Sequence, residues 1–243
     1  MPFELEWVGL AGFRMIPNTG PVIVMDPYDP GVVADASKTD RAILDYQLQA
    51  DQVLASSLTD KAHSYIPAID GNPKVIDAMD VAQGKISPQI NGEPVIAVQA
   101  GESPDHPEGP DDNAMYALNV DGLWILHMGD LGYELGAEEL APFAGHCDIL
   151  LALTGEGLTL SLESLDRMID ILQPSWIVPM HYRLPPLGSV TMTKLAPFLE
   201  RRSGDPLIYV RHHTVTFPLP KMAADRPTIV VIEPSAYEPT EPQ

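Results

Sequence analysis

The stretch Val53–Tyr65, VLASSLTDKAHSY, decides how the fold of this chain is predicted. It begins with the apolar run Val53-Leu54-Ala55, which is typical of a short buried strand. It then becomes polar, and both Asp60 and His63 follow within a few positions. Because α/β proteins usually place their chemistry on loops that leave the ends of buried strands, this loop is the first candidate for a functional site.

Two later loops repeat this design. His127 and Asp130 follow the apolar run 123–126, and His181 follows the run 176–178. Imidazoles and carboxylates that come from several strand ends are the side chains that a divalent metal site requires. A catalytic zinc ion takes three protein ligands and lowers the pKa of its bound water to near neutrality. The three loops together therefore predict a metal site, although any one of these histidines alone is more often a packed structural residue.

The rest of the chain predicts a mixed α/β protein. Apolar alternation, turn signals such as Asp121-Gly122 and stripes with helical spacing place the elements. They predict a single domain, 1–234, with two mixed sheets covered by helices, and a flexible Pro/Glu-rich tail, 235–243. Strands are expected at 3–8, 13–16, 21–25, 52–55, 74–76, 94–98, 115–120, 123–126, 148–153, 176–178, 207–210, 214–217 and 228–232, and helices at 42–48, 137–143, 160–172 and 193–202.

Composition excludes several classes of partner. The chain of 243 residues carries 34 acidic and 14 basic side chains, so its formal charge is −20. That charge repels nucleic acid and anionic lipid, and no apolar run reaches the ~18 residues of a membrane-spanning helix. Cys147 is the single cysteine, which rules out an intrachain disulfide and a cysteine-based zinc site. Because no signal-peptide pattern is present, we expect a cytoplasmic protein with a small-molecule substrate and with neither nucleic acid nor membrane as a partner.

In these strand-end loops and the strands before them, the sequence resembles a known family, the metallo-β-lactamase superfamily. Within it, the chain is similar to the branch of bacterial ascorbate-6-phosphate lactonases and related zinc hydrolases. The resemblance implies a four-layered αββα sandwich of two mixed β-sheets with the active site along one edge. The matching pieces are 8–13, Asp26-Pro27-Tyr28, the loop 57–63, Leu126-His127-Met128-Gly129-Asp130, and 177–182.

The chain departs from the family pattern at several metal positions. The family loop reads Ser/Thr-His-x-His-x-Asp-His, and here Leu58, Asp60 and Ala62 take its first three ligand positions while His63 keeps the last. The family's early Gly-His-Ala has Leu10 in place of its histidine. The family's third histidine follows the strand at 94–98, where this chain reads Gln99-Ala100-Gly101-Glu102-Ser103, with His106 further along.

Carried over position by position, the resemblance implies one metal site rather than two. His63, Asp130 and His181 are kept, and Asp60 is a candidate fourth ligand. We therefore expect one divalent ion (Zn, Mn or Fe) or none at all. The exchange of a histidine for Asp60 favours the harder ions Mn²⁺ and Fe²⁺ over Zn²⁺. Asp130 and Asp60 are the candidate catalytic residues.

Four further residues are weaker candidates near this centre. His127 could orient a metal ligand, and Tyr182 could donate to a developing oxyanion. Glu102 and His106, in the loop over the expected site, could replace the missing ligand. Each of the four has an ordinary structural or surface role as its alternative.

Three functions remain open from the sequence. The first is a metal-dependent hydrolase that acts on a small ester, lactone or phosphoester, which the retained His63, Asp130 and His181 favour. The second is a metal-free descendant that binds a ligand or partner, which the apolar Leu58, Ala62 and Leu10 favour. The third is a metal-independent enzyme with Asp60 and His63 as acid and base, which rests on their proximity alone.

Overall fold

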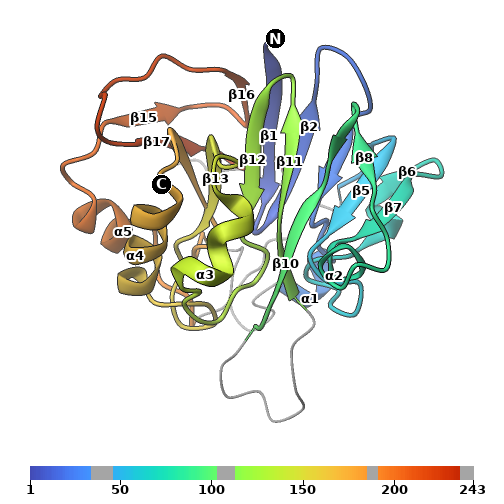
Figure 1. The fold of residues 1–243 in the computed structure, drawn as a ribbon, viewed down its shortest axis with the longest axis horizontal. Helices are drawn as coiled ribbons and strands as arrows, with labels where there is room; N and C mark the ends of the chain where they lie inside the picture. Colours follow the sequence, from blue (N-terminus) through green and yellow to red (C-terminus); the bar gives the residue numbers. More distant parts are fainter. Residues whose placement is uncertain (34–45, 103–112, 185–190, 236–243) are drawn as a thin grey trace, which may run out of the picture.

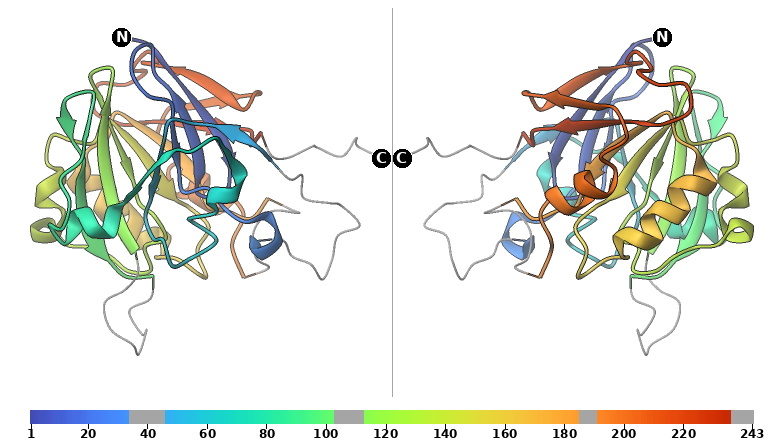
Figure 2. Two further views of the ribbon diagram at one scale, coloured as in Figure 1. Left: turned by 90° about the vertical axis from the view of Figure 1, so that its right-hand side faces the viewer. Right: turned by 90° about the vertical axis from the view of Figure 1, so that its left-hand side faces the viewer.

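The computed structural model describes residues 1–33, 46–102, 113–184 and 191–235. Within these ranges the chain forms a six-stranded sheet, a seven-stranded sheet and two pairs of short strands. The side views in Figure 2 show the layers in order: the helices α3 (Ala137–Leu140) and α4 (Leu162–Leu172), the seven-stranded sheet, the six-stranded sheet, and α1 (Pro30–Val33) beyond it. The predicted α/β sandwich of two mixed sheets is confirmed.

The six-stranded sheet has the order β16-β1-β2-β3-β5-β7 and comes mainly from the N-terminal half of the chain. β1, β2 and β3 form an antiparallel meander, whereas β5 runs parallel to both β3 and β7. The strands span Phe3–Gly9 (β1), Gly12–Ile16 (β2), Ile23–Met25 (β3), Gln52–Ala55 (β5), Lys74–Asp77 (β7) and Thr214–Phe217 (β16).

The seven-stranded sheet has the order β10-β11-β12-β13-β14-β17-β15. β10, β11 and β12 pair antiparallel, and the strands from β12 onward pair in parallel. They span Ile96–Ala100 (β10), Asn113–Val120 (β11), Leu123–His127 (β12), Ile149–Leu153 (β13), Trp176–Met180 (β14), Leu207–Val210 (β15) and Thr228–Ile232 (β17). The pairs of short strands are Leu48–Gln49 (β4) with Ile69–Asp70 (β6), and Gln89–Ile90 (β8) with Glu93–Pro94 (β9).

The described helices are short. The longest is α4, and its sequence explains why one of its faces packs on the core. Its apolar residues recur at helical spacing and lie in the core, and the Ser161 hydroxyl accepts a hydrogen bond from the Ser164 amide at its start. Figure 1 shows α3, α4 and α5 together on one side of the molecule. The helices are Pro30–Val33 (α1), Ala78–Ala82 (α2), Ala137–Leu140 (α3), Leu162–Leu172 (α4) and Ala196–Arg201 (α5), with 3₁₀ turns at Ile66–Ala68 (η1) and Ala141–Phe143 (η2).

β5 is buried on both faces, which explains its continuous apolar run. Leu54 belongs to the main core, to which both sheets contribute, whereas Val53 belongs to a smaller cluster with Leu48 and Ile69. After Gln52 at its start the strand carries only apolar side chains, and the next polar side chains come after Ala55, where the chain leaves the sheet. β12, β13 and β14 are parallel neighbours, so the loops that follow β12 and β14 emerge at one edge of their sheet.

Most predicted strands are confirmed, including 207–210, 214–217 and 228–232 with the same bounds. The predicted helix at 42–48 is wrong at its end, because Leu48 begins the strand β4; residues 42–45 lie outside the described ranges. The helix α2 was not predicted. Of the predicted tail, Ser235 is described, and its amide donates a hydrogen bond to the Trp7 carbonyl at 2.7 Å. Among the described residues, no helix is long and apolar enough to cross a bilayer.

Candidate metal centre

The loop after β5 holds His63 through a tight turn. The Ser57 hydroxyl accepts hydrogen bonds from the amides of Thr59 and Asp60, each at 3.3 Å, and the His63 amide donates to the Asp60 carbonyl at 3.1 Å. The loop also pairs with the segment that follows β3, because the Tyr65 amide donates to the Pro27 carbonyl at 2.6 Å. As a result the imidazole of His63 points inward and has no exposed surface.

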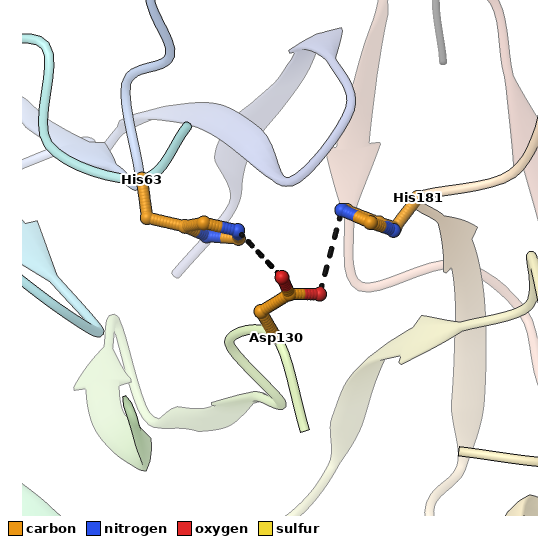
Figure 3. A group of neighbouring side chains, drawn as sticks. All are labelled: His63, Asp130 and His181. Carbon is orange, nitrogen blue, oxygen red and sulfur yellow. Dashed lines mark ion pairs between the residues drawn. The ribbon is translucent and has the colours of Figure 1, made fainter. Parts of the chain in front are cut away.

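Asp130 and His181 come from the loops after β12 and β14. The Asp130 amide donates to the Asn113 side-chain oxygen at 2.9 Å, which fixes the loop beside the start of β11. His181 has a φ of 54°, a left-handed conformation that non-glycine residues adopt infrequently, and its amide donates to the Leu10 carbonyl at 3.0 Å. These contacts place both side chains opposite His63, as Figure 3 shows.

The carboxylate of Asp130 lies between the two imidazoles. Its Oδ2 is 3.5 Å from His63 Nε2, and its Oδ1 is 3.5 Å from His181 Nε2. Among the described residues, neither Asp130 Oδ1 nor His63 Nε2 has a hydrogen-bond partner, although both atoms are buried. Buried polar atoms are seldom left without a partner, so the group has unused capacity to bind.

The geometry of this group fits a divalent ion. The three side chains offer one ligand atom each within 4.8 Å of one another. Two donors bound to one tetrahedral zinc ion at about 2.0–2.1 Å lie roughly 3.3–3.4 Å apart, which is close to the separations found here. Two imidazoles and one carboxylate also match the three-ligand sets of catalytic zinc sites. His63, Asp130 and His181 are therefore suited to hold a metal ion.

Asp26 fixes the orientation of His63. It follows β3, is fully buried, and accepts a hydrogen bond from His63 Nδ1 at 2.7 Å. This bond places a proton on Nδ1 and turns Nε2 toward Asp130, as in other metal sites where a carboxylate orients a histidine ligand. Burial opposes the charged imidazole, but the carboxylates of Asp130 and Asp26 outweigh burial and raise the pKa of His63 well above its usual value.

The charges on the two carboxylates follow from the same contacts. Burial acts to raise the pKa of Asp130, but His181 and His63 lower it to about 2. Burial likewise opposes the ionised form of Asp26, but His127 and His63 together hold its pKa below the usual value. His181 itself has a lowered pKa because it is buried. The centre therefore contains two ionised carboxylates near neutral pH.

His127 contacts Asp26 rather than the three candidate ligands. Its Nδ1 accepts a hydrogen bond from the Gly129 amide at 2.9 Å, and its Nε2 donates to the Ala11 carbonyl at 2.9 Å. The ring stacks on Tyr116 with the centroids 5.0 Å apart, and burial lowers its pKa. Both ring nitrogens therefore have hydrogen-bond partners. His127 is in its neutral form and packs between Tyr116 and the loops of the centre as a structural residue.

Three carboxylates form a second group at the same centre. Asp60, Glu102 and Asp130 each offer an oxygen within 4.8 Å of the others, and all three are partly exposed. The sequence places Asp60 as a candidate fourth ligand of the imidazole group and Glu102 as a substitute ligand. The structure brings both next to Asp130, so Asp130 is shared by the two groups.

The remaining predicted positions are not among the three ligands, and one of them lies outside the described ranges. Tyr182 packs on Trp7 with the ring centroids 5.2 Å apart, and burial raises the pKa of its hydroxyl. Leu58, at the first ligand position of the family loop, is 43% exposed. His106 falls outside the described residues.

The sequence interpretation missed Asp26 and its partners. The signal is present, because Asp26 follows a buried strand as Asp130 does, but the sequence analysis gives Asp26-Pro27-Tyr28 only as a piece that matches the family and assigns Asp26 no role. Ser56 and Tyr116 also donate to the Asp26 carboxylate, the latter at 2.9 Å. These partners lie in β11 and beside β5, and nothing in the local sequence pattern links them to Asp26.

A polar hollow elsewhere in the molecule is separate from this centre. It has a volume of about 750 Å³ and lies between α4, α5 and residues 221–227. Ser175, just before β14, lines it, whereas His181 follows the other end of that strand. The hollow and the candidate centre therefore lie at opposite ends of β14.

Comparisons with known proteins identify the family of the chain. The family model of the beta-lactamase superfamily domain matches residues 4–181. A protein of Thermococcus onnurineus named a metal-dependent hydrolase is 23% identical over 207 residues, which are 76% of this chain and 88% of that protein. Both sets of residues in the candidate centre lie within the matched range of the family model.

Two solved structures share the fold. A proposed zinc-dependent hydrolase of the metallo-β-lactamase superfamily from Thermotoga maritima has a TM-score of 0.66 and 22% identity, over 95% of this chain and 98% of that one. Igni18, a metallo hydrolase from Ignicoccus hospitalis, has a TM-score of 0.61 and 17% identity, over 90% and 100% of the two chains. The resemblance to the ascorbate-6-phosphate lactonase branch stays a prediction. Because the family model covers most of the chain and the two-sheet fold agrees with it, the chain belongs to the metallo-β-lactamase superfamily.

Proposed function

We propose that the protein is a metal-dependent hydrolase that cleaves a small ester, lactone or phosphoester at the centre formed by His63, Asp130 and His181. The observation that carries this proposal is the pair of 3.5 Å separations between Asp130 and the two imidazoles, with buried donor atoms that have no partner among the described residues. The names of the similar proteins support hydrolysis as the reaction class.

The roles of the side chains follow from their contacts. A divalent ion at this position supplies Lewis-acid polarisation of the scissile bond and lowers the pKa of water to near neutrality. Asp26 holds the Nδ1 proton of His63, so that Nε2 would present its lone pair to a bound ion in place of a proton. Asn113 positions the backbone at Asp130 by accepting its amide.

Asp60 is the proposed proton acceptor. Its Oδ1 accepts a hydrogen bond from the Ala62 amide at 2.8 Å, which fixes the carboxylate, and an oxygen of Asp60 lies within 4.8 Å of Asp130. Asp60 is partly exposed, so its other oxygen can take a proton from the attacking water and pass it to the leaving group or to solvent. The formal charge of −20 favours a neutral or weakly anionic small molecule over a nucleic acid.

The first test is metal content together with hydrolysis. Protein purified without chelators is analysed for transition metals, then stripped, reloaded with Zn²⁺, Mn²⁺ or Fe²⁺, and assayed on an activated ester, a lactone and a phosphodiester. We expect hydrolysis of one of these classes to depend on reloading. His63→Ala and His181→Ala should lose both the metal and the activity.

The matched control is His146→Gln. His146 packs edge-on against Trp124, with the centroids 4.4 Å apart, and it precedes β13, whereas the candidate ligands follow the opposite ends of their strands. This variant should keep both metal and activity. Less than about a tenth of an equivalent of every metal, with none taken up on addition, would instead favour the metal-free binding protein.

A further inference from the structure

We propose that the polar hollow between α4, α5 and residues 221–227 binds a small organic anion with at least two negative charges, of the class of phosphate esters and polycarboxylates. The site is independent of the proposed function, because the hollow and the candidate centre lie at opposite ends of β14. Its volume of about 750 Å³ is within the range of small-molecule sites in proteins.

Basic side chains are concentrated in this hollow. Four of the 14 lysines and arginines of the chain line it, although the chain carries 34 acidic residues. The field of a chain with a formal charge of −20 repels anions at long range, so an anion needs cations that are held at short range. The four cations are Arg201, Arg202, Lys221 and Arg226.

Two of the four cations are paired with carboxylates. Asp166 Oδ2 lies 2.7 Å from Arg201 Nη2, and Asp205 Oδ2 lies 2.6 Å from Arg202 Nε. Asp166 Oδ1 also lies 3.4 Å from Arg202 Nη1, so the two pairs form one network that joins α4 to the end of α5. These pairs form one wall of the hollow and leave the other two cations for a ligand.

Lys221 and Arg226 have no carboxylate partner among the described residues, and each contacts a neutral group instead. The Lys221 Nζ lies over the Trp176 ring, 5.8 Å from its centroid. Arg226 Nη1 donates to the Gly204 carbonyl at 2.8 Å, and the guanidinium has further N–H groups to donate. A Cβ atom on Gly204 would collide with Arg226 Nη1, so this glycine makes room for the guanidinium. Both cations are thus held in place without being neutralised, which is what a bound anion requires.

The other polar groups of the lining agree with a small anion. Asp170 and Asp225 are exposed, and within the part of the chain that the structure describes neither is held by a hydrogen bond or an ion pair. They stay hydrated and repel a bound anion, which limits its affinity without removing the site. The Ser175 hydroxyl and the Gln173 amide add neutral donors.

Isothermal titration calorimetry tests the site. The full chain is first freed of metal, because the two probes, inorganic pyrophosphate and citrate, chelate metal ions. We expect one equivalent of at least one probe to bind at low ionic strength, and its affinity to fall as potassium chloride is added. The comparison of the probes shows whether phosphoryl or carboxylate oxygens are preferred. Arg226→Gln and Lys221→Gln should each weaken binding at least tenfold.

Three further variants separate this site from general charge effects. Lys74→Gln is the matched control, because it removes one exposed cation on β7, in the other sheet, and should bind the probe as the unmodified protein does. Gly204→Ala should weaken binding without any change of charge, since the added methyl group displaces Arg226. Asp225→Asn should tighten binding, because it removes a negative charge beside the anion.

The outcomes decide the proposal. His181→Ala should bind the probe unchanged, and loss of binding in this variant would place the anion at the candidate centre instead. If neither probe binds, or if Arg226→Gln binds as tightly as Lys74→Gln, the proposed site is wrong. Weaker binding in Asp225→Asn would show that the hollow does not select an anion. Thermal melting of each variant without a probe checks that its fold is intact.

Discussion

Asp26 is the residue through which the candidate centre is built. Burying a carboxylate is costly unless it is hydrogen-bonded, and Asp26 accepts bonds from Ser56, His63 and Tyr116. Its φ of 42° is a left-handed conformation, which turns the side chain back toward these partners immediately after β3. The orientation of His63 thus depends on a residue that does not itself belong to the group of three candidate ligands.

Replacing Asp26 with asparagine tests this role. In Asp26→Asn the side-chain amide can face His63 Nδ1–H, and two donors in contact force the imidazole proton onto Nε2, away from Asp26. We expect metal affinity to fall by about 10–100-fold, as with other residues that orient a histidine ligand. The measurement is competition with a chromophoric chelator at fixed pH.

Asp51→Asn provides the comparison for this variant. The Asp51 carboxylate accepts the Val22 amide at 2.8 Å, just before β5, so it too supports the six-stranded sheet but at the other end of that strand. Its replacement should change stability without changing metal affinity. Equal metal affinity in Asp26→Asn and the unmodified protein would show that Asp26 is only structural.

At the scale of the element, the turn after β12 brings Asp130 into position. Gly129 has a φ of +61°, and a Cβ atom there would meet the Asn113 side chain and would lie 2.8 Å from the Ser56 Cβ. Asn113 in turn accepts the Asp130 amide. The sequence Met128-Gly129-Asp130 therefore turns tightly because its middle residue has no side chain.

Gly129→Ala should consequently cost stability and also reduce metal affinity. The left-handed conformation alone costs about 1–3 kcal/mol for a residue with a side chain, and the contact with Asn113 adds to it. Gly122→Ala separates the cost of the backbone conformation from the cost of the side-chain contact, because Gly122 has a φ of +91° but nothing within 4 Å of an added Cβ. Chemical denaturation should show a larger loss for Gly129→Ala, and only this variant should bind metal more weakly.

Sequence patterns predicted the elements well where the pattern is local. The hairpin at Asp121-Gly122 is confirmed, and both residues have the positive φ that such a turn requires. The helix expected at 42–48 failed at Leu48 because that residue pairs with Ile69 in a distant strand. Contacts with a remote segment override local propensity, and a single sequence carries no sign of them.

In the candidate site, too, the sequence predicts what is local and misses what depends on remote segments. His63, Asp130 and His181 could be selected from the sequence because each follows a buried strand. The partnership of Asp26 with Ser56 and Tyr116 could not, because it depends on how two sheets face each other. The grouping of Glu102 with Asp60 has the same cause, since their loops belong to different sheets.

For the whole molecule, the ligands connect the two sheets. His63 follows a strand of the six-stranded sheet, whereas Asp130 and His181 follow strands of the seven-stranded sheet. An ion that binds all three should stabilise the folded chain, by roughly 2.7 kcal/mol at a free metal concentration of 100 times Kd. For a protein of this size that corresponds to a rise in Tm of about 5–10 °C.

Differential scanning fluorimetry with excess Zn²⁺ and with EDTA measures this shift. We expect the shift in the unmodified protein and in His146→Gln, and its disappearance in His181→Ala. The same Tm with Zn²⁺ and with EDTA, in protein first shown to be free of metal, would mean that the three residues do not form a binding site in solution.

The origin of the ligands in two sheets also has a consequence for how the protein matures in the cell. Neither half of the chain can assemble the three-residue group by itself, so a nascent chain has no complete ion site until its C-terminal strands have been synthesised and docked. Metal capture is then one of the last events in biogenesis. Occupancy of the centre would report that both halves have been joined correctly, and a truncated or mispaired chain would be distinguished by its failure to retain an ion.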